Sequence, residues 1–206
     1  MTASTVSAPR CPGSAAAAAT VWLGLAVAAG ATGFLLRLPF PGPQLIILTL
    51  VALTLAAGSV PSRLRAWIDA IPLRVLVAVN ATRFIGITFL VLAAQGQVNP
   101  AFAARAGWGD IATALVAIAL VATGGQLTPG RRVLYHAWNA FGFLDLVVAV
   151  GTATAVTLNG ATPGVAPVLT FPLSLVPTFF VPLFLANHVF IFRRLVAAGS
   201  GGAHGG

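Results

Sequence analysis

The chain has no glutamate and no lysine, and its 206 residues include only three aspartates and one cysteine. Charged residues make up 7% of the sequence, whereas an ordinary soluble domain has about 25%. So few charges cannot cover a water-soluble surface, which excludes an ordinary soluble protein. The single cysteine, Cys11, excludes both a disulfide framework and a Cys-x-x-Cys redox pair.

Motifs of the common enzyme classes are missing as well. The sequence contains no Gly-x-Ser-x-Gly, no His-Glu-x-x-His, no phosphate loop and no dinucleotide fingerprint. It also has no soluble domain for a nucleotide, so primary active transport by this chain alone is excluded. We therefore expect a protein that is not an enzyme, with no bound metal.

Apolar residues instead make up 58% of the chain and gather in six long stretches. A helix that crosses a bilayer needs ~20 mostly apolar residues. The sequence thus predicts an all-α fold, a polytopic transmembrane helix bundle at residues 15–195, with a disordered tail at 1–14 and a flexible glycine-rich tail at 196–206. The six predicted spans are 15–36, 44–60, 73–95, 110–123, 136–158 and 171–192. The fourth is short, and it can be extended backward through residues 101–108.

The arginines predict the orientation of the bundle, because cytoplasmic connections carry an excess of positive charge. An even number of spans puts both termini on the same side. With both termini in the cytoplasm, the outer connections carry only Arg37 and Arg105. The cytoplasmic connections and tails then carry Arg10, Arg63, Arg65, Arg74, Arg131, Arg132, Arg193 and Arg194. The sequence therefore predicts an N-in/C-in protein.

Two connections have helical patterns of their own. In residues 62–71, apolar side chains recur at helical spacing, which indicates either a short helix on the cytoplasmic leaflet or the frayed start of the third span. On the outer side, Asn99 and Pro100 open a predicted helix that ends near Gly107. Asp110 then caps the fourth span, although a functional carboxylate is the alternative.

A candidate polar site lies at membrane depth, where ionisable groups are costly and mark function or helix pairing. Arg83 follows Arg74 by nine residues and Asp145 follows His136 by nine, so both lie near the midplane at ~1.5 Å per residue. Asn80, one turn before Arg83, and Asn139 on the fifth span complete the candidate site. Its two interpretations are a solute or proton site and a buried pair that locks two spans together.

Two histidines give an alternative with a cofactor. His136 and His188 lie at one predicted depth, ~6–8 Å below the cytoplasmic boundary, and could ligate a b-type haem. Interfacial histidines that anchor helix ends are the other interpretation. A Soret band in the absorption spectrum would identify haem, and we expect no cofactor.

Three prolines interrupt the sixth span. Pro172, Pro177 and Pro182 cannot donate to the helix ladder, so the carbonyls of Leu173 and Thr178 lose their usual partners. The sequence predicts a kinked helix with free acceptors, which line binding cavities in some transporters and are also tolerated as ordinary features of membrane spans.

Residues 83–188 resemble small uncharacterised multi-pass membrane proteins of bacteria. The resemblance is carried by RFIGITFLVLAAQG, FAARAGWGD, WNAFGFLDLVVAV and FPLSLVPTFFVPLFLANH. It implies a bacterial inner-membrane location and no assigned activity.

Together these features predict an integral membrane protein that handles a small solute or a proton, or serves as a non-catalytic subunit of a membrane complex. The alternatives are a haem-binding redox subunit and a structural or assembly factor. The predicted partners are the lipid bilayer and either a second copy or another membrane subunit, with no nucleic acid.

Overall fold

The computed structural model describes residues 11–60 and 62–200, and all regular structure in this part of the chain is helical. Six segments are long and apolar enough to cross a membrane. They are α1 (Gly13–Ala31), α3 (Gly42–Ser59), the continuous run of α5 (Leu73–Val79), η1 (Asn80–Ile85) and α6 (Gly86–Ala94), α7 (Pro100–Thr123), α8 (Pro129–Leu158), and the π-helical turn η3 (Val176–Phe180) with α9 (Val181–Ser200). The predicted all-helical fold with six long apolar helices is confirmed.

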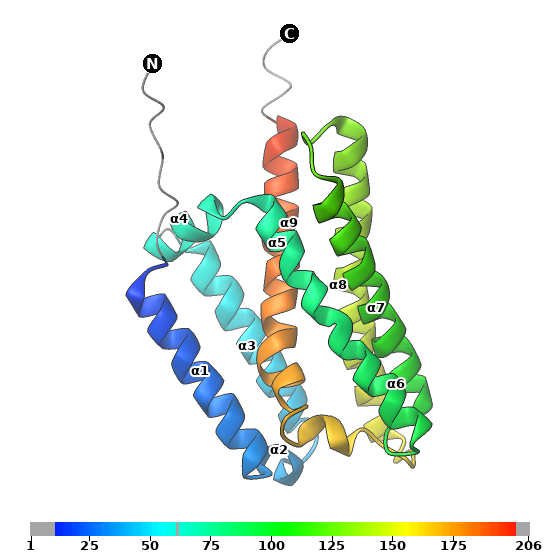
Figure 1. Cartoon of the computed structure of the whole chain (residues 1–206). Coiled ribbons are helices and arrows are strands. Elements are labelled where there is room, and N and C mark those ends of the chain that lie inside the picture. Colours follow the sequence, from blue (N-terminus) through cyan, green and yellow to red (C-terminus); the bar gives the residue numbers. More distant parts are fainter. Residues whose placement is uncertain (1–10, 61, 201–206) are drawn as a thin grey trace, which may run out of the picture.

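The helices form one bundle in which α9 has a central place (Figure 1). It packs against α3 on one side and against α5 and α8 on the other. The helix α7 lies between α8 and the run α5–η1–α6. At one end of the bundle α1 begins and α9 ends, and α4 (Arg63–Ala70) lies there too; α2 (Phe34–Arg37) and η2 (Ala166–Leu169) lie at the opposite end (Figure 1).

The outer surface of the long helices is apolar. Large side chains such as Leu25 on α1, Leu48 on α3 and Leu144 on α8 are more than half exposed. The bundle interior, in contrast, contains several fully buried polar side chains, including Arg83, Asn139 and His188. A soluble protein rarely exposes so much contiguous apolar surface, whereas a lipid-facing protein requires it.

The predicted boundaries of the first, fifth and sixth spans were wrong. The fifth long helix, α8, begins at Pro129 rather than at residue 136. The first helix ends at Ala31, because Gly33 adopts a φ of +67° and a short helix, α2, follows. The sixth long helix begins at Val176 rather than at residue 171 and continues to Ser200.

The fourth span is longer than its predicted core, and Asp110 is not its cap. Asn99 caps α7 as predicted, since its Oδ1 accepts from the backbone N–H groups of Ala101 and Phe102. The helix does not end near Gly107 but continues to Thr123. Asp110 therefore lies near the middle of a single helix, where its carboxylate is not needed by a helix terminus.

Residues 63–70 form the separate helix α4, so this connection is not the frayed start of the third span. The Ser62 side chain accepts from the backbone N–H of Arg65, and Pro72 separates α4 from α5. Arg193 and Arg194 of α9 hold this connection, donating to the carbonyls of Gly58 and Ile68.

Part of each predicted tail is helical where the structure describes it. The helix α1 begins at Gly13, and α9 continues through Ser200 instead of ending before residue 196. Residues 1–10 and 201–206 lie outside the described part of the chain.

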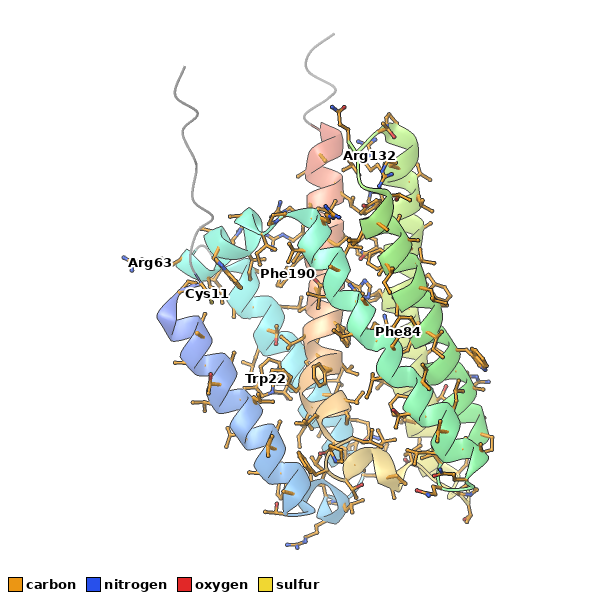
Figure 2. All side chains as sticks on the ribbon, viewed as in Figure 1. Cys11, Trp22, Arg63, Phe84, Arg132 and Phe190 are labelled. Atoms are coloured by element: carbon orange, nitrogen blue, oxygen red, sulfur yellow. The ribbon has the colours of Figure 1, made fainter. Side chains whose placement is uncertain are left out.

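The two carbonyls that lose their helical partners to proline accept other hydrogen bonds. The carbonyl of Thr178 accepts the indole N–H of Trp22 at 2.8 Å, and that of Leu173 accepts the backbone N–H of Val176 at 2.9 Å. Figure 2 shows Trp22 reaching from α1 toward the rest of the bundle. Nearby, Gly30 packs so tightly on Ser174 that a Cβ there would overlap the serine side chain. These contacts attach α1 to the start of the sixth long helix.

Candidate functional site

The candidate site begins with a local tightening of the third long helix. The backbone N–H of Asn80 bonds to the carbonyl of Val77, three residues back, and a turn of 3₁₀ helix follows to Ile85. The carbonyl of Leu76 instead accepts the side-chain Nδ2 groups of Asn80, at 3.2 Å, and of Asn187 on α9, at 2.9 Å. This tightened segment carries Arg83 into the bundle interior.

The guanidinium of Arg83 is fully buried and contacts three other long helices. Its Nε donates to Oδ1 of Asp110 on α7 at 2.7 Å, and its Nη2 donates to Oδ2 of Asp145 on α8. Its Nη1 donates to the carbonyl of Gly142 at 2.9 Å and lies 3.4 Å from Nε2 of His188 on α9. We call Arg83, Asp110, Asp145 and His188 the charged cluster.

His188 is held by Asn139. The Nδ2 of Asn139 donates to the backbone carbonyl of His188 at 2.9 Å, and its Oδ1 lies 2.7 Å from Nδ1 of the imidazole. An amide oxygen only accepts, so Nδ1 is the donor and Nε2 of the neutral ring is the acceptor that faces Arg83. Asn139 thus fixes both the orientation and the tautomer of the histidine.

Glycines make the close approach of these side chains possible. A Cβ at Gly109 would overlap Oδ1 of Asp145, and one at Gly86 would lie 2.6 Å from Cβ of Asp110. A Cβ at Gly142 would lie 2.7 Å from Cε1 of His188. Small residues at helix contacts let backbones approach closely in membrane bundles.

The charged cluster is closed toward the end of the bundle where α9 ends. Each of its members lies near the middle of its span. Beyond the cluster in that direction a set of apolar side chains fills the interior between α5, α7, α8 and α9. They are Leu76, Val77, Ala117, Leu120, Tyr135, Trp138, Ile191 and Leu195. A water molecule finds few polar partners among such residues.

Toward the opposite end, the cluster adjoins a cavity of about 360 Å³. Its walls come from α2, α3, α6, α7, α8, the connection after α8, and the η3–α9 segment, and they are mostly apolar. Asp110 lines the cavity, and Arg83, Asp145 and His188 do not. The charge that the cluster presents to this space is therefore a carboxylate.

Of the predicted polar residues, Arg83, Asn80 and Asn139 are fully buried and Asp145 is partly buried. Arg83 and Asp145 are in direct contact, and Asn139 joins them through His188. The Oδ1 of Asn80 has no hydrogen-bond partner, and no bond joins this residue to Arg83 among those described.

Sequence reasoning missed the roles of two residues in the cluster. Asp110 was assigned to a helix cap, and His188 was placed near the cytoplasmic boundary. The second assignment was wrong because α9 continues well past Arg193, so His188 lies deeper than the arginine pair suggested. The signal for Asp110 was that residues 101–123 are mostly apolar, with only Arg105 and Asp110 charged, and that glycine is common in membrane helices and need not end them.

Haem binding by His136 and His188 stays an alternative prediction. The contacts of the two imidazole rings show what such binding would require. Both ring nitrogens of His188 face partners, Asn139 and Arg83, so iron binding would require one of these contacts to break. The ring of His136 stacks on Phe192, with centroids 6.1 Å apart. Within the described residues, no group of three or more His, Cys, Asp or Glu side chains is placed to hold a metal ion.

Comparison with known proteins places residues 40–196 in a family described as a domain of unknown function, DUF8737. The chain belongs to this family. No curated protein and no solved structure matches it. With its six apolar helices, this DUF8737 member is an integral membrane protein of unassigned activity.

The DUF8737 region contains the whole charged cluster and the tightened segment that carries Arg83. It begins after α1 and α2. The first long helix thus lies outside the matched region, and it is attached to the rest of the bundle by Trp22 and Gly30 as described above.

Proposed function

We propose that this protein handles a proton within the membrane, or a small solute coupled to one, at the charged cluster. The observation that carries the proposal is a single guanidinium shared by two carboxylates, one of which lines a cavity. Polar and ionisable groups in membrane spans mark ion pathways and proton relays.

The charges of the cluster support this function. One arginine balances one carboxylate, so the second carboxylate is available to bind a proton or another cation. The Oδ1 of Asp110 accepts from Arg83, and the carboxylate also lines the cavity. Asp110 is therefore the group that would exchange a proton with the cavity, and Asp145, which does not line it, would hold Arg83 in place.

The access to the cluster supports it as well. The site adjoins a cavity toward one end of the bundle and is closed by apolar side chains toward the other, an asymmetry that suits a carrier or a gated path. Movement of the sixth long helix would change the access to the cluster. Such movement is favoured at the start of this helix, where its π-helical turn and two prolines interrupt the regular backbone hydrogen bonds.

A flux measurement tests the proposal. Liposomes that contain the protein should take up protons faster than protein-free liposomes when valinomycin and a potassium gradient impose a negative interior, as measured with a trapped pH-sensitive dye. Asp110→Asn keeps the size of the side chain but removes the proton site, and it should reduce uptake to the protein-free rate. Asp69→Asn, on the partly exposed α4 carboxylate, is the matched control and should leave uptake unchanged. Equal rates for wild type and folded Asp110→Asn would refute the proposal.

We also propose the N-in/C-in orientation in a bacterial inner membrane, surrounded by lipid. The described arginines that support this orientation lie at the end of the bundle where α9 ends. Figure 2 labels two of them, Arg63 and Arg132. Arg37 and Arg105 lie toward the other end. This asymmetry is the pattern of a positive cytoplasmic side.

Reporter fusions test the orientation. Fusions after Arg132 and after Arg194 should show cytoplasmic activity, and one near Pro163, in the connection between α8 and the sixth long helix, should show periplasmic activity. Periplasmic activity at Arg132 would contradict the arrangement.

A second candidate function is a structural one, in a non-catalytic subunit or an assembly factor. It is favoured by the bonds of Arg83 to α7, α8 and α9, which join four long helices at one point. Wild-type protein that folds and conducts no protons would favour this candidate.

A further inference from the structure

We infer that the cavity beside the charged cluster takes an amphipathic cation, of which a protonated alkyl amine is the simplest form. The inference rests on the proposed function, because it names a substrate class for the same site. It does not require that protons themselves cross the membrane.

The walls of the cavity suit an apolar body. They include the aromatic rings of Phe40, Phe89, Phe102 and Phe184 and many aliphatic side chains. Ligand pockets of a few hundred Å³ with mostly apolar walls and a few polar groups are typical of small-molecule sites. A strongly hydrated inorganic ion would find few ligands here, whereas an alkyl chain would lose no hydrogen bonds on entry.

The polar groups of the cavity select a head group that donates hydrogen bonds. Asp110 supplies a carboxylate, and Oε1 of Gln44 is buried without a partner. Two threonines also line the cavity, but the hydroxyls of Thr154 and Thr157 donate to the helix carbonyls of Val150 and Ala153. No arginine, lysine or histidine is among the lining residues. A carboxylate or phosphate head would therefore meet acceptors, and an ammonium head would satisfy them.

The two acceptors come from different helices: Asp110 lies on α7, and Gln44 lies in the first turn of α3. Gln44 precedes Ile47 by about one turn of α3. Ile47 packs with Leu146 and Phe184. The ring of Phe184 in turn lies 5.8 Å from the guanidinium carbon of Arg83. Asp110 and the Phe184 ring both neighbour Arg83 and both line the cavity, and a carboxylate and an aromatic face each attract cations.

Three ligands with one chain length and different heads test the inference. Decylammonium, decanol and decanoate are titrated into the full-length protein in lipid nanodiscs, with protein-free nanodiscs as the blank, and binding is measured by calorimetry. We expect saturable binding of decylammonium that is roughly tenfold or more tighter than that of decanol, because a charge-assisted hydrogen bond adds about that much. Decanoate should be the weakest.

Variants locate the binding. Asp110→Asn should reduce the affinity for decylammonium to that for decanol and leave decanol binding unchanged. Ala153→Phe fills the cavity without touching a charge, and it should abolish binding of all three ligands. Ala155→Phe, on the exposed side of the same helix, is its matched control and should bind like wild type.

Each result has a definite meaning. Equal affinities for the three heads would show apolar filling alone and overturn the inference, as would binding that survives Ala153→Phe. If Asp110→Asn does not fold, the pair Ala153→Phe and Ala155→Phe still decides the location. Amine binding without proton flux would support the inference and refute proton handling, and flux without amine binding would do the reverse.

Discussion

Arg83→Ala is expected to reduce the stability of the protein by about 3–5 kcal/mol, because it leaves Asp110 and Asp145 unbalanced at the centre of the bundle. Unfolding in detergent, followed with heat or denaturant, measures the loss. Arg37→Ala, on the exposed α2, is the control and should change stability by less than about 0.5 kcal/mol.

Rescue of this variant tests whether the three residues act together. Arg83→Ala with Asp145→Asn should recover only part of the stability, since Asp110 keeps an unpaired charge. Adding Asp110→Asn removes the last charge and should recover most of it. If the losses in unfolding free energy from the single substitutions simply add in the combined variants, the residues do not interact and the cluster does not stabilise the bundle. A triple variant that folds and conducts no protons would separate stability from function.

Gly142→Ala is expected to destabilise the contact between α8 and α9 beside the cluster. The new Cβ would lie 2.7 Å from Cε1 of His188 and 2.9 Å from Cγ2 of Thr113, in a part of the bundle where both side chains are fully buried. Overpacking of this kind costs about 1–3 kcal/mol. It should also displace His188 from Arg83 and reduce proton uptake in the flux assay.

Gly151→Ala is the matched control for this substitution. It lies on the same helix, α8, and a Cβ there meets nothing within 4 Å. Alanine forms helices better than glycine, so this variant should be neutral or more stable by up to about 1 kcal/mol. Equal melting temperatures for the two alanine variants would show that α8 and α9 adjust freely and that the contact is unimportant.

The sequence allowed the helical class and six long apolar helices to be predicted, because bilayer thickness constrains the length of a span. The contact between Arg83 and Asp145 followed from two helix depths, counted from Arg74 and from His136. The same counting failed for His188, because Arg193 and Arg194 bond back to Gly58 of α3, Ile68 of α4 and the following Ile71, and do not end the helix. Depth can be counted only from a residue that lies at the boundary.

Other features depend on tertiary contacts that leave little local trace. The indole of Trp22 satisfies the carbonyl that Pro182 releases, and the free acceptor was predictable while its partner on α1 was not. The assignment of Asp110 to a cap followed local preference, and the nearby arginine from another span overrode it. The cavity has no sequence signature, because it lies between side chains from many elements.

The absence of glutamate has a practical consequence for spectroscopy. The acidic side chains of the sequence are three aspartates, and one of them, Asp69, is accessible on α4. In an Asp69→Asn background, every side-chain carboxyl band in a difference infrared spectrum comes from Asp110 or Asp145. Isotope labelling of aspartate then reports on the two buried groups directly, without the assignment problem that most membrane proteins present.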